Sequence, residues 1–138
     1  MKTKGFTLVE LLVVIAILAI LATVSVVGYT SFIERAEQSN TDTEAHQIAT
    51  SIESALVIPG DVYQVAAGCY AKVVDDVITL YTTEACTAEV AADATFDLNA
   101  DGAEGDFAGL EGTLKVASGK LVYVSDNGTE ADVVAVGN

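Results

Sequence analysis

The sequence lacks the short motifs that mark common enzyme sites. It contains no GxSxG, HExxH, P-loop or GxGxxG pattern, and His46 is the single histidine among 138 residues. One imidazole in an acidic chain leaves no evident pairing of a general base with a nucleophile. We therefore expect no enzymatic activity. We also expect His46 to be solvated rather than a ligand, because it falls on a polar part of a predicted helix.

Basic residues are also scarce. Lys and Arg number 6 against 20 Asp and Glu, which gives a formal net charge of −14. Such a charge disfavours contact with the phosphates of nucleic acids and with anionic lipid head groups. We therefore expect no generic binding of nucleic acid. The acidic balance instead favours a solvated exterior or the binding of cations.

Cysteine occurs only twice, as Cys69 and Cys86, and the chain has no CxxC motif. Two well-separated cysteines in an exported chain favour one disulfide over a reactive or metal-bound pair. They bracket the stretch YAKVVDDVITLYTTEA, which is a predicted hairpin. A bridge across it would add about 3 kcal/mol by the chain-entropy estimate.

The apolar residues that are present gather at the N-terminus. Residues 11–22, LLVVIAILAILA, have no polar side-chain atom, and the apolar stretch covers residues 6–27. A helix of this length spans a bilayer. Lys2 and Lys4 place its N-terminus in the cytoplasm by the positive-inside rule. No small-x-small cleavage site follows, as a conventional secretory leader requires.

One acid interrupts this apolar run. A carboxylate in hydrocarbon costs about 2.5–3.5 kcal/mol even on lenient insertion scales, so Glu10 is a functional hypothesis by default. No Lys or Arg follows it before Arg35. The alternatives are a plain signal anchor that tolerates one acid and a carboxylate that has a specific partner.

Residues 4–10, KGFTLVE, followed by the apolar run, resemble the leader junction of type IV pilins and their relatives. Those relatives include the pseudopilins of type II secretion and the competence pilins. The resemblance covers about residues 1–36. In that family a membrane peptidase cuts after the glycine, and the new N-terminal phenylalanine is methylated. The resemblance implies a leader of residues 1–5, cleavage between Gly5 and Phe6, and N-methylation of Phe6.

The resemblance also gives Glu10 a partner. Cleavage creates an α-amino group on Phe6 with a reference pKa of about 8, so this group can be cationic. Phe6 and Glu10 are i, i+4 neighbours in a helix, so an intramolecular pair is one alternative. The resemblance implies instead the Phe6 amine of a neighbouring subunit in a filament core, where opposite charges attract strongly. Glu10 would then select and register subunits during assembly.

The helix is predicted to continue beyond the membrane, because apolar residues recur at spacings of three and four. This stripe consists of Ala45, Ile48, Ala49, Ile52, Ala55 and Leu56. Proline is absent before Pro59, and Pro59-Gly60 ends the helix. We therefore expect one helix over residues 6–58, with residues 6–28 as the transmembrane segment and filament core. Relatives often have a helix breaker in that segment, for which Thr23–Gly28 is the candidate here.

After Pro59 the pattern changes to short runs rich in Val, Ile, Thr and Tyr. The predicted strands are residues 62–66, 70–74, 77–82, 113–117, 121–125 and 132–136, and the predicted turns are Asp75-Asp76, Ser118-Gly119 and Asn127-Gly128. The predicted fold is α+β. The long N-terminal helix has a transmembrane half and an amphipathic half, and it packs on a small antiparallel β-sheet head of residues 59–138. The resemblance implies the same pilin-like architecture.

The segment DLNADGAEGD, residues 97–106, follows the first half of a calcium-binding loop, D-x-[DN]-x-[DN]-G. The candidate ligands are Asp97, Asn99, Asp101 and Asp106. Position twelve is Ala108, so the bidentate glutamate is missing, and Asp106, Glu104 or Glu111 would have to replace it. The alternatives are a structural calcium site and a solvated acidic loop. No cofactor is otherwise required.

The resemblance implies a structural subunit of a type IV pilus or pilus-like filament, assembled through its hydrophobic N-terminal helix. The alternative is a type II secretion pseudopilin, or a minor or competence pilin, with a calcium-stabilised head. The implied partners are copies of the same chain, the prepilin peptidase and methylase, the assembly machinery, and the membrane. The implied location is a single-pass membrane precursor and then an extracellular filament. Adhesion, motility, secretion and DNA uptake stay open as roles.

Overall fold

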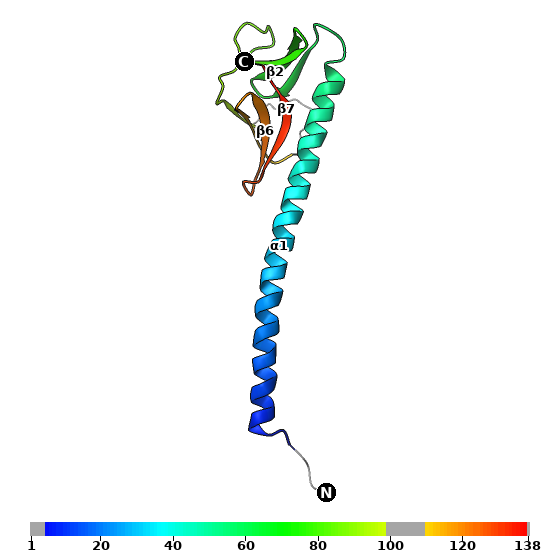
Figure 1. The fold of residues 1–138 in the computed structure, drawn as a ribbon. Helices are drawn as coiled ribbons and strands as arrows, with labels where there is room; N and C mark the ends of the chain where they lie inside the picture. The colour runs from blue at the N-terminus through cyan, green and yellow to red at the C-terminus, as the bar shows by residue number, and fades with distance from the viewer. Residues whose placement is uncertain (1–4, 99–109, 138) are drawn as a thin grey trace. The chain divides into compact units, whose positions relative to one another are not determined.

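The computed structural model describes residues 5–98 and 110–137 of the chain (Figure 1). The chain forms two compact units, Met1–Ala36 and Glu37–Asn138. Helix α1, Leu8–Ala55, contributes residues to both units and lies inside the predicted range of residues 6–58.

In the first unit, α1 buries none of its apolar side chains. Every residue from Gly5 to Arg35 is exposed. The helix contains an 18-residue window with a mean hydropathy of 3.0, no part of which is buried. By length and composition it can cross a membrane. Because the chain itself covers none of this surface, lipid or other helices must cover it.

In the second unit, one face of α1 is buried. The buried helix residues are Thr41, Ala45, Ile48, Ala49 and Ile52. The predicted stripe is confirmed, because Leu56 is also buried and Ala55 is half-buried. The helix ends at Ala55. A turn follows in which the Asp61 N–H donates to the Ile58 carbonyl at 3.2 Å.

The strands form two antiparallel sheets. The three-stranded sheet has the order β1-β2-β3, with β1 Val62–Ala66, β2 Cys69–Val74 and β3 Val77–Tyr81. The four-stranded sheet has the order β4-β5-β6-β7, with β4 Thr95–Asp97, β5 Gly112–Ala117, β6 Lys120–Ser125 and β7 Glu130–Ala135. The sequence predicted a single sheet and missed β4. The α+β pilin-like architecture is nevertheless confirmed, with the helix packed on antiparallel sheets.

Two of the predicted turns join strands in tight hairpins. Asp75 and Asp76 have φ angles of 50° and 64°, and Ser118 and Gly119 have φ angles of 53° and 73°. Positive φ at both central residues is the geometry of a type I′ turn, which matches the twist of the strands on either side. These turns connect β2 to β3 and β5 to β6.

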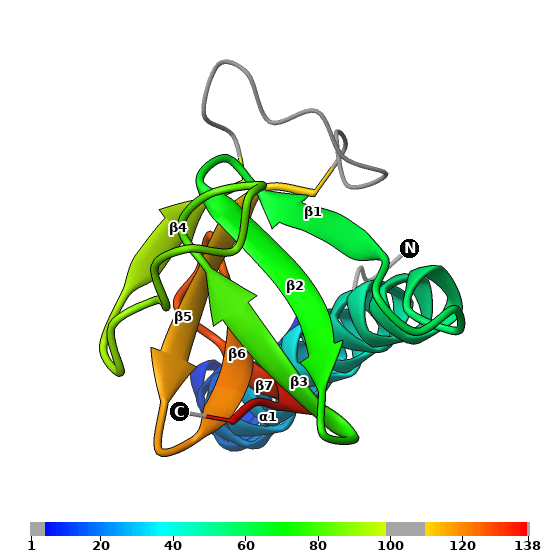
Figure 2. The same cartoon turned by 90° about the horizontal axis from the view of Figure 1, so that it is seen from above.

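One hydrophobic core joins the helix to both sheets. Its fully buried large side chains include Ile48, Ile52, Val65, Leu114, Leu121 and Tyr123. Figure 2 shows the three-stranded sheet in front of the four-stranded sheet, with α1 alongside. The C-terminal end also ties the sheets together, because the Gly137 N–H donates to the Ile78 carbonyl at 2.8 Å.

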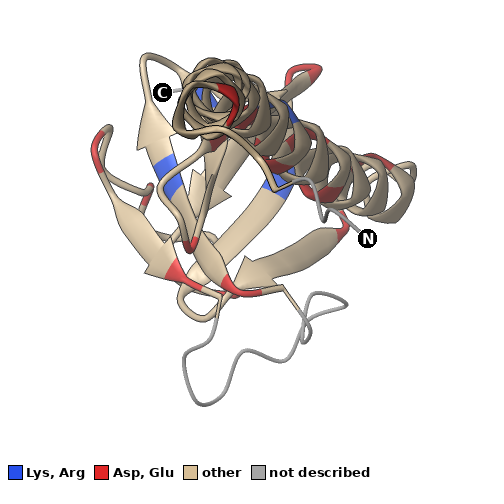
Figure 3. Ribbon diagram, turned by 90° about the horizontal axis from the view of Figure 1, so that it is seen from below, with Lys and Arg blue, Asp and Glu red and all other residues tan. Residues whose placement is uncertain are grey.

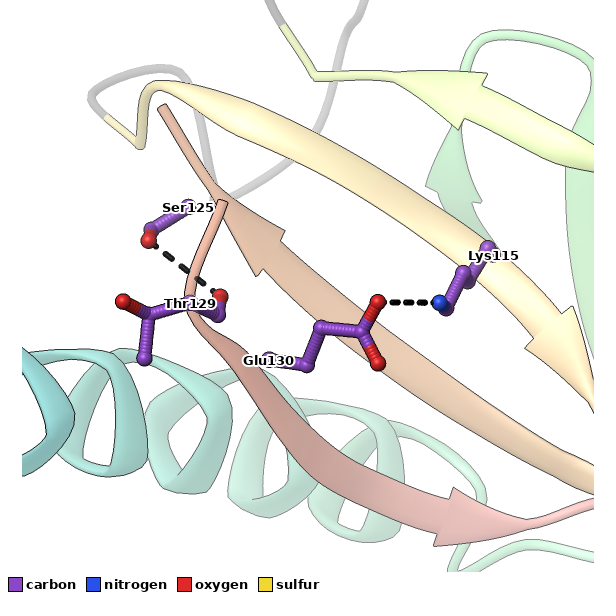
Figure 4. Close-up of polar contacts among 4 residues, drawn as sticks. All are labelled: Lys115, Ser125, Thr129 and Glu130. Carbon is purple, nitrogen blue, oxygen red and sulfur yellow. Dashed lines mark hydrogen bonds and ion pairs between the residues drawn. The ribbon is translucent and has the colours of Figure 1, made fainter. Parts of the chain in front are cut away.

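Acidic positions outnumber basic positions along the ribbon of the described chain (Figure 3). Lys115 pairs with Glu130, and Lys120 pairs with Asp132 at 2.9 Å. The Lys115–Glu130 pair joins β5 to β7 across the intervening β6, and the Lys120–Asp132 pair joins the neighbouring strands β6 and β7. Figure 4 shows the Lys115–Glu130 pair beside the β6–β7 turn, where the Ser125 hydroxyl donates to the Thr129 carbonyl. Such exposed pairs contribute about 0–1 kcal/mol each.

Candidate functional site

The predicted cleavage bond lies just outside the helix. Gly5, Phe6 and Thr7 are not helical, and α1 begins at Leu8. The Phe6 residue is 89% exposed, and a Cβ at Gly5 would meet no atom within 4 Å. The Gly5–Phe6 bond therefore lies in exposed, non-helical chain, as a peptidase substrate requires.

Glu10 forms a reciprocal capping box with Thr7. The Thr7 N–H donates to Glu10 Oε2 at 3.3 Å, and the Glu10 N–H donates to Thr7 Oγ1 at 3.2 Å. Each side chain thus satisfies a backbone N–H that has no partner inside the helix. The sequence contains the T-x-x-E signal of a capping box directly before the apolar run. Thr7 is therefore a hydrogen-bond partner of Glu10 that the sequence prediction missed.

Three hydroxyls interrupt the apolar surface further along α1. Thr23 Oγ1 donates to the Ile20 carbonyl at 2.7 Å, and Ser25 Oγ donates to the Leu21 carbonyl at 2.7 Å. Thr30 makes a similar bond within the helix at 3.0 Å. These bonds let the hydroxyls sit in apolar surroundings without an unsatisfied donor. The helix is continuous through Thr23–Gly28.

Cys69 and Cys86 both carry free thiols in the structure. Cys69 is fully buried at the start of β2, and burial raises the pKa of its thiol to about 12. Cys86 is half-buried, and its Sγ lies 3.6 Å from the Glu84 carbonyl oxygen. The predicted β2–β3 hairpin between the cysteines is present. Their disulfide stays a prediction.

Of the four predicted calcium ligands, the structure describes only Asp97. It is exposed at the end of β4, where its backbone pairs with Thr113. Asn99, Asp101 and Asp106 lie outside the described residues. Within residues 5–98 and 110–137, no group of three or more His, Cys, Asp and Glu side chains is placed to hold a metal ion. Calcium binding stays a prediction.

A cavity of about 350 Å³ in the second unit gathers acidic side chains. Its lining consists of Glu37, Asn40, Thr41, Glu44, Glu111, Ser125, Asp126 and Asn127. A side-chain hydrogen bond to Asp126 and repulsion from that carboxylate raise the pKa of Glu111. Nearby, the fully buried Tyr123 donates its hydroxyl to the Glu111 carbonyl at 2.7 Å. Burial, followed by interaction with Glu44, raises the pKa of Tyr123 well above its usual range.

A second cavity, of about 660 Å³, lies between α1 and β7 and includes His46 in its lining. His46 is exposed, as the sequence analysis expected. Gln38 spans one end, where its Nε2 donates to Asp42 at 2.9 Å and to the Glu130 carbonyl at 3.2 Å. The cavity therefore joins a helix face to the edge of a sheet, and the described residues that line it include no Ser, Thr or Cys.

Comparison with known proteins finds a family match for the N-terminal segment. Residues 1–26 match the family model described as the prokaryotic N-terminal methylation motif. This is the type IV prepilin-like signal motif, so the resemblance drawn from residues 4–10 is confirmed. The motif implies processing by a prepilin peptidase and handling by an assembly machinery, and it points to a structural protein. No curated protein and no solved structure matches the chain.

Proposed function

We propose that the chain is a structural subunit of a type IV pilus or pilus-like filament, assembled through its N-terminal helix. The observation that carries this proposal is the prepilin-like motif over residues 1–26, joined to a helix with a fully exposed apolar surface. A helix that covers none of its own apolar surface needs lipid before assembly and neighbouring helices afterwards. Copies of the same chain are therefore its partners.

The proposed precursor is a single-pass membrane protein with a cytoplasmic N-terminus. A prepilin peptidase removes residues 1–5 and exposes the amine of Phe6, which is then methylated. The segment of residues 6–58 contains helix α1, Leu8–Ala55, and its residues 6–28 are the proposed filament core. Residues 59–138 form the proposed head on the outer surface of the filament. Mass analysis of filament protein should find a methylated Phe6 at the N-terminus.

Glu10 is the proposed assembly determinant. In a helix bundle its carboxylate attracts the Phe6 amine of a second copy, and an unpaired charge there costs about 3–5 kcal/mol. Replacing it by Gln or Val should leave membrane insertion intact, because the change removes a charge from hydrocarbon. The yield of sheared filaments should fall by more than tenfold. Glu34→Gln, which removes an acid beyond the apolar run of the same helix, is the control. A normal filament yield from Glu10→Val would contradict the pairing of Glu10 with the Phe6 amine.

The second candidate is a pseudopilin of type II secretion, or a minor or competence pilin, with a calcium-stabilised head. The half-matched calcium loop beginning at Asp97 favours it. The copy number of the chain in sheared surface filaments separates the two candidates. A major subunit dominates the preparation, whereas a minor pilin is present at trace level and a pseudopilin is absent from it.

A further inference from the structure

The two carboxylate oxygens of Glu10 have different surroundings. Oε2 accepts the Thr7 N–H at 3.3 Å. Within residues 5–98 and 110–137, Oε1 has no hydrogen-bond partner. One oxygen is thus committed inside the subunit, and the other is available to a donor from outside it. A carboxylate has about four lone-pair sites, so the two bonds can coexist.

We propose that Thr7 is a positioning residue for assembly: its capping box with Glu10 aims the carboxylate so that Oε1 receives the Phe6 amine of a second copy. The inference rests on the proposed function and adds a second residue to the assembly contact. Thr7 touches neither the amine nor the neighbouring subunit in this scheme. It acts through the orientation of Glu10.

The geometry of the capping box explains why a threonine serves here. The Thr7 hydroxyl accepts the Glu10 N–H at 3.2 Å, which fixes the start of the helix at Leu8. The Glu10 side chain then turns back toward the N-terminus, the direction in which helical side chains lean. Its carboxylate therefore points along the chain toward the end where the amine forms. Without the hydroxyl, the first turn frays and the carboxylate samples other rotamers.

Three variants test this role in the full chain in its native host. Thr7→Val keeps the shape of the side chain and removes its hydroxyl, and it should lower filament yield about three- to tenfold, the size of a lost N-cap. Thr7→Ser keeps the hydroxyl and should restore the yield. Thr23→Val removes a hydroxyl from the same helix, where it donates only to the Ile20 carbonyl, and should leave the yield unchanged. Insertion and cleavage of each precursor are measured in parallel.

A second measurement follows the capping bond itself. In detergent-solubilised full-length precursor, the Thr7 amide proton resonance should move as the Glu10 carboxyl titrates. The same resonance should be insensitive to pH in Glu10→Gln. In Thr7→Val the amide proton at position 7 should move less during the same titration, because the carboxylate samples other rotamers without the hydroxyl. A Thr7 amide that ignores the titration in the wild-type chain would overturn the inference.

The outcomes also separate this inference from the proposed function. Normal assembly of Thr7→Val together with failure of Glu10→Val overturns the role of Thr7 and leaves the filament function intact. Loss of cleavage in Thr7→Val overturns the inference as well, because the defect then precedes assembly. Normal assembly of Glu10→Val overturns the pairing on which both rest.

Discussion

Glu10 and Glu111 are carboxyl groups in opposite circumstances. Glu10 accepts a backbone N–H at the positive end of a helix, which favours a negative charge. Glu111 lies beside another carboxyl group, Asp126, which disfavours a second negative charge. The first arrangement therefore holds an acid in an apolar segment, whereas the second makes an acid a source of instability at neutral pH.

The raised pKa of Glu111 gives the head a predicted dependence on pH. A folded-state pKa above the unfolded value, ordinarily near 4.5, means that the folded head binds this proton more tightly. The stabilisation is complete below the unfolded pKa and is lost as the pH rises through the folded pKa. Glu111→Gln should raise the melting temperature at pH 7 and remove the gain on acidification in that window. Thermal melts across pH 4–7 measure this.

Glu84→Gln is the matched control, because it removes one exposed acid from the loop after β3, outside the acidic cavity. This variant should keep the pH dependence of the wild-type head. A Glu111→Gln head whose melting temperature follows the wild-type curve over the whole range would refute the role of the Glu111–Asp126 contact.

Among individual residues, the sequence indicates those that are recognised from a few neighbouring positions in the chain. Glu10 is conspicuous because it interrupts an apolar run, and the Thr7 signal lies only three residues before it. The contact of Glu111 with Asp126 joins residues far apart in the chain. It depends on the register of β5 with β6, which pairs Gly112 with Ser125. The predicted Ser118-Gly119 turn fixes this register, because a two-residue hairpin loop determines which residues lie opposite one another, and one position beyond the ladder sets Glu111 across from Asp126. The sequence therefore contained a signal for this contact, which the sequence prediction missed.

At the scale of the element, periodic patterns predicted the structure well. The helical stripe at residues 45–56 is long and regular, and β1 coincides with the predicted residues 62–66. Strand β4, Thr95–Asp97, is too short to show a period of two. The division into two sheets was also missed. This division depends on which strands pair across the longer loops. Turn residues indicate only the pairing of two strands that are joined by a hairpin.

The β2–β3 hairpin carries the disulfide prediction. Tyr70 pairs with Tyr81, so Cys69 lies at the end of the ladder from which the loop containing Cys86 begins. Exported protein should yield one cross-linked pair on non-reducing peptide mapping and no free thiol. Closing this loop stabilises the head by about 3 kcal/mol, so reduction should lower its melting temperature.

The reduced, folded protein provides the control for that experiment. Because burial raises the pKa of the Cys69 thiol to about 12, an alkylating agent should modify Cys86 first and Cys69 only on unfolding. Two alkylatable thiols in unfolded exported protein, without any reductant, would contradict the bridge.

At the scale of the whole molecule, charge and apolar surface are segregated. The apolar helix surface lies in the unit Met1–Ala36, and the buried core lies in the unit Glu37–Asn138. Removal of the proposed leader, residues 1–5, would take away Lys2 and Lys4 and leave 4 of the 6 basic residues against 20 acidic ones. A head so rich in carboxylates repels itself, and bound cations relieve that repulsion.

Calcium should therefore stabilise the head if Asp97, Asn99 and Asp101 act as ligands. A soluble fragment of residues 34–138 contains the whole buried core and is suited to thermal melts. If calcium binds the folded head and not the unfolded chain, a hundredfold excess over its Kd adds about 2.7 kcal/mol to the free energy of unfolding. The melting temperature should rise by several degrees with calcium and return to its starting value with chelator.

Magnesium and one substitution show whether any such effect is specific. Magnesium demands a tight octahedral shell and sheds water reluctantly, so it should stabilise the head less than calcium does. Asp101→Ala removes a charged ligand and should abolish most of the calcium effect, whereas Asp93→Asn removes a charge before the loop and should preserve it. General screening of an acidic surface would act in both variants and with both ions. Equal responses to calcium and magnesium, or no response to either, would leave residues 97–106 as a solvated acidic loop.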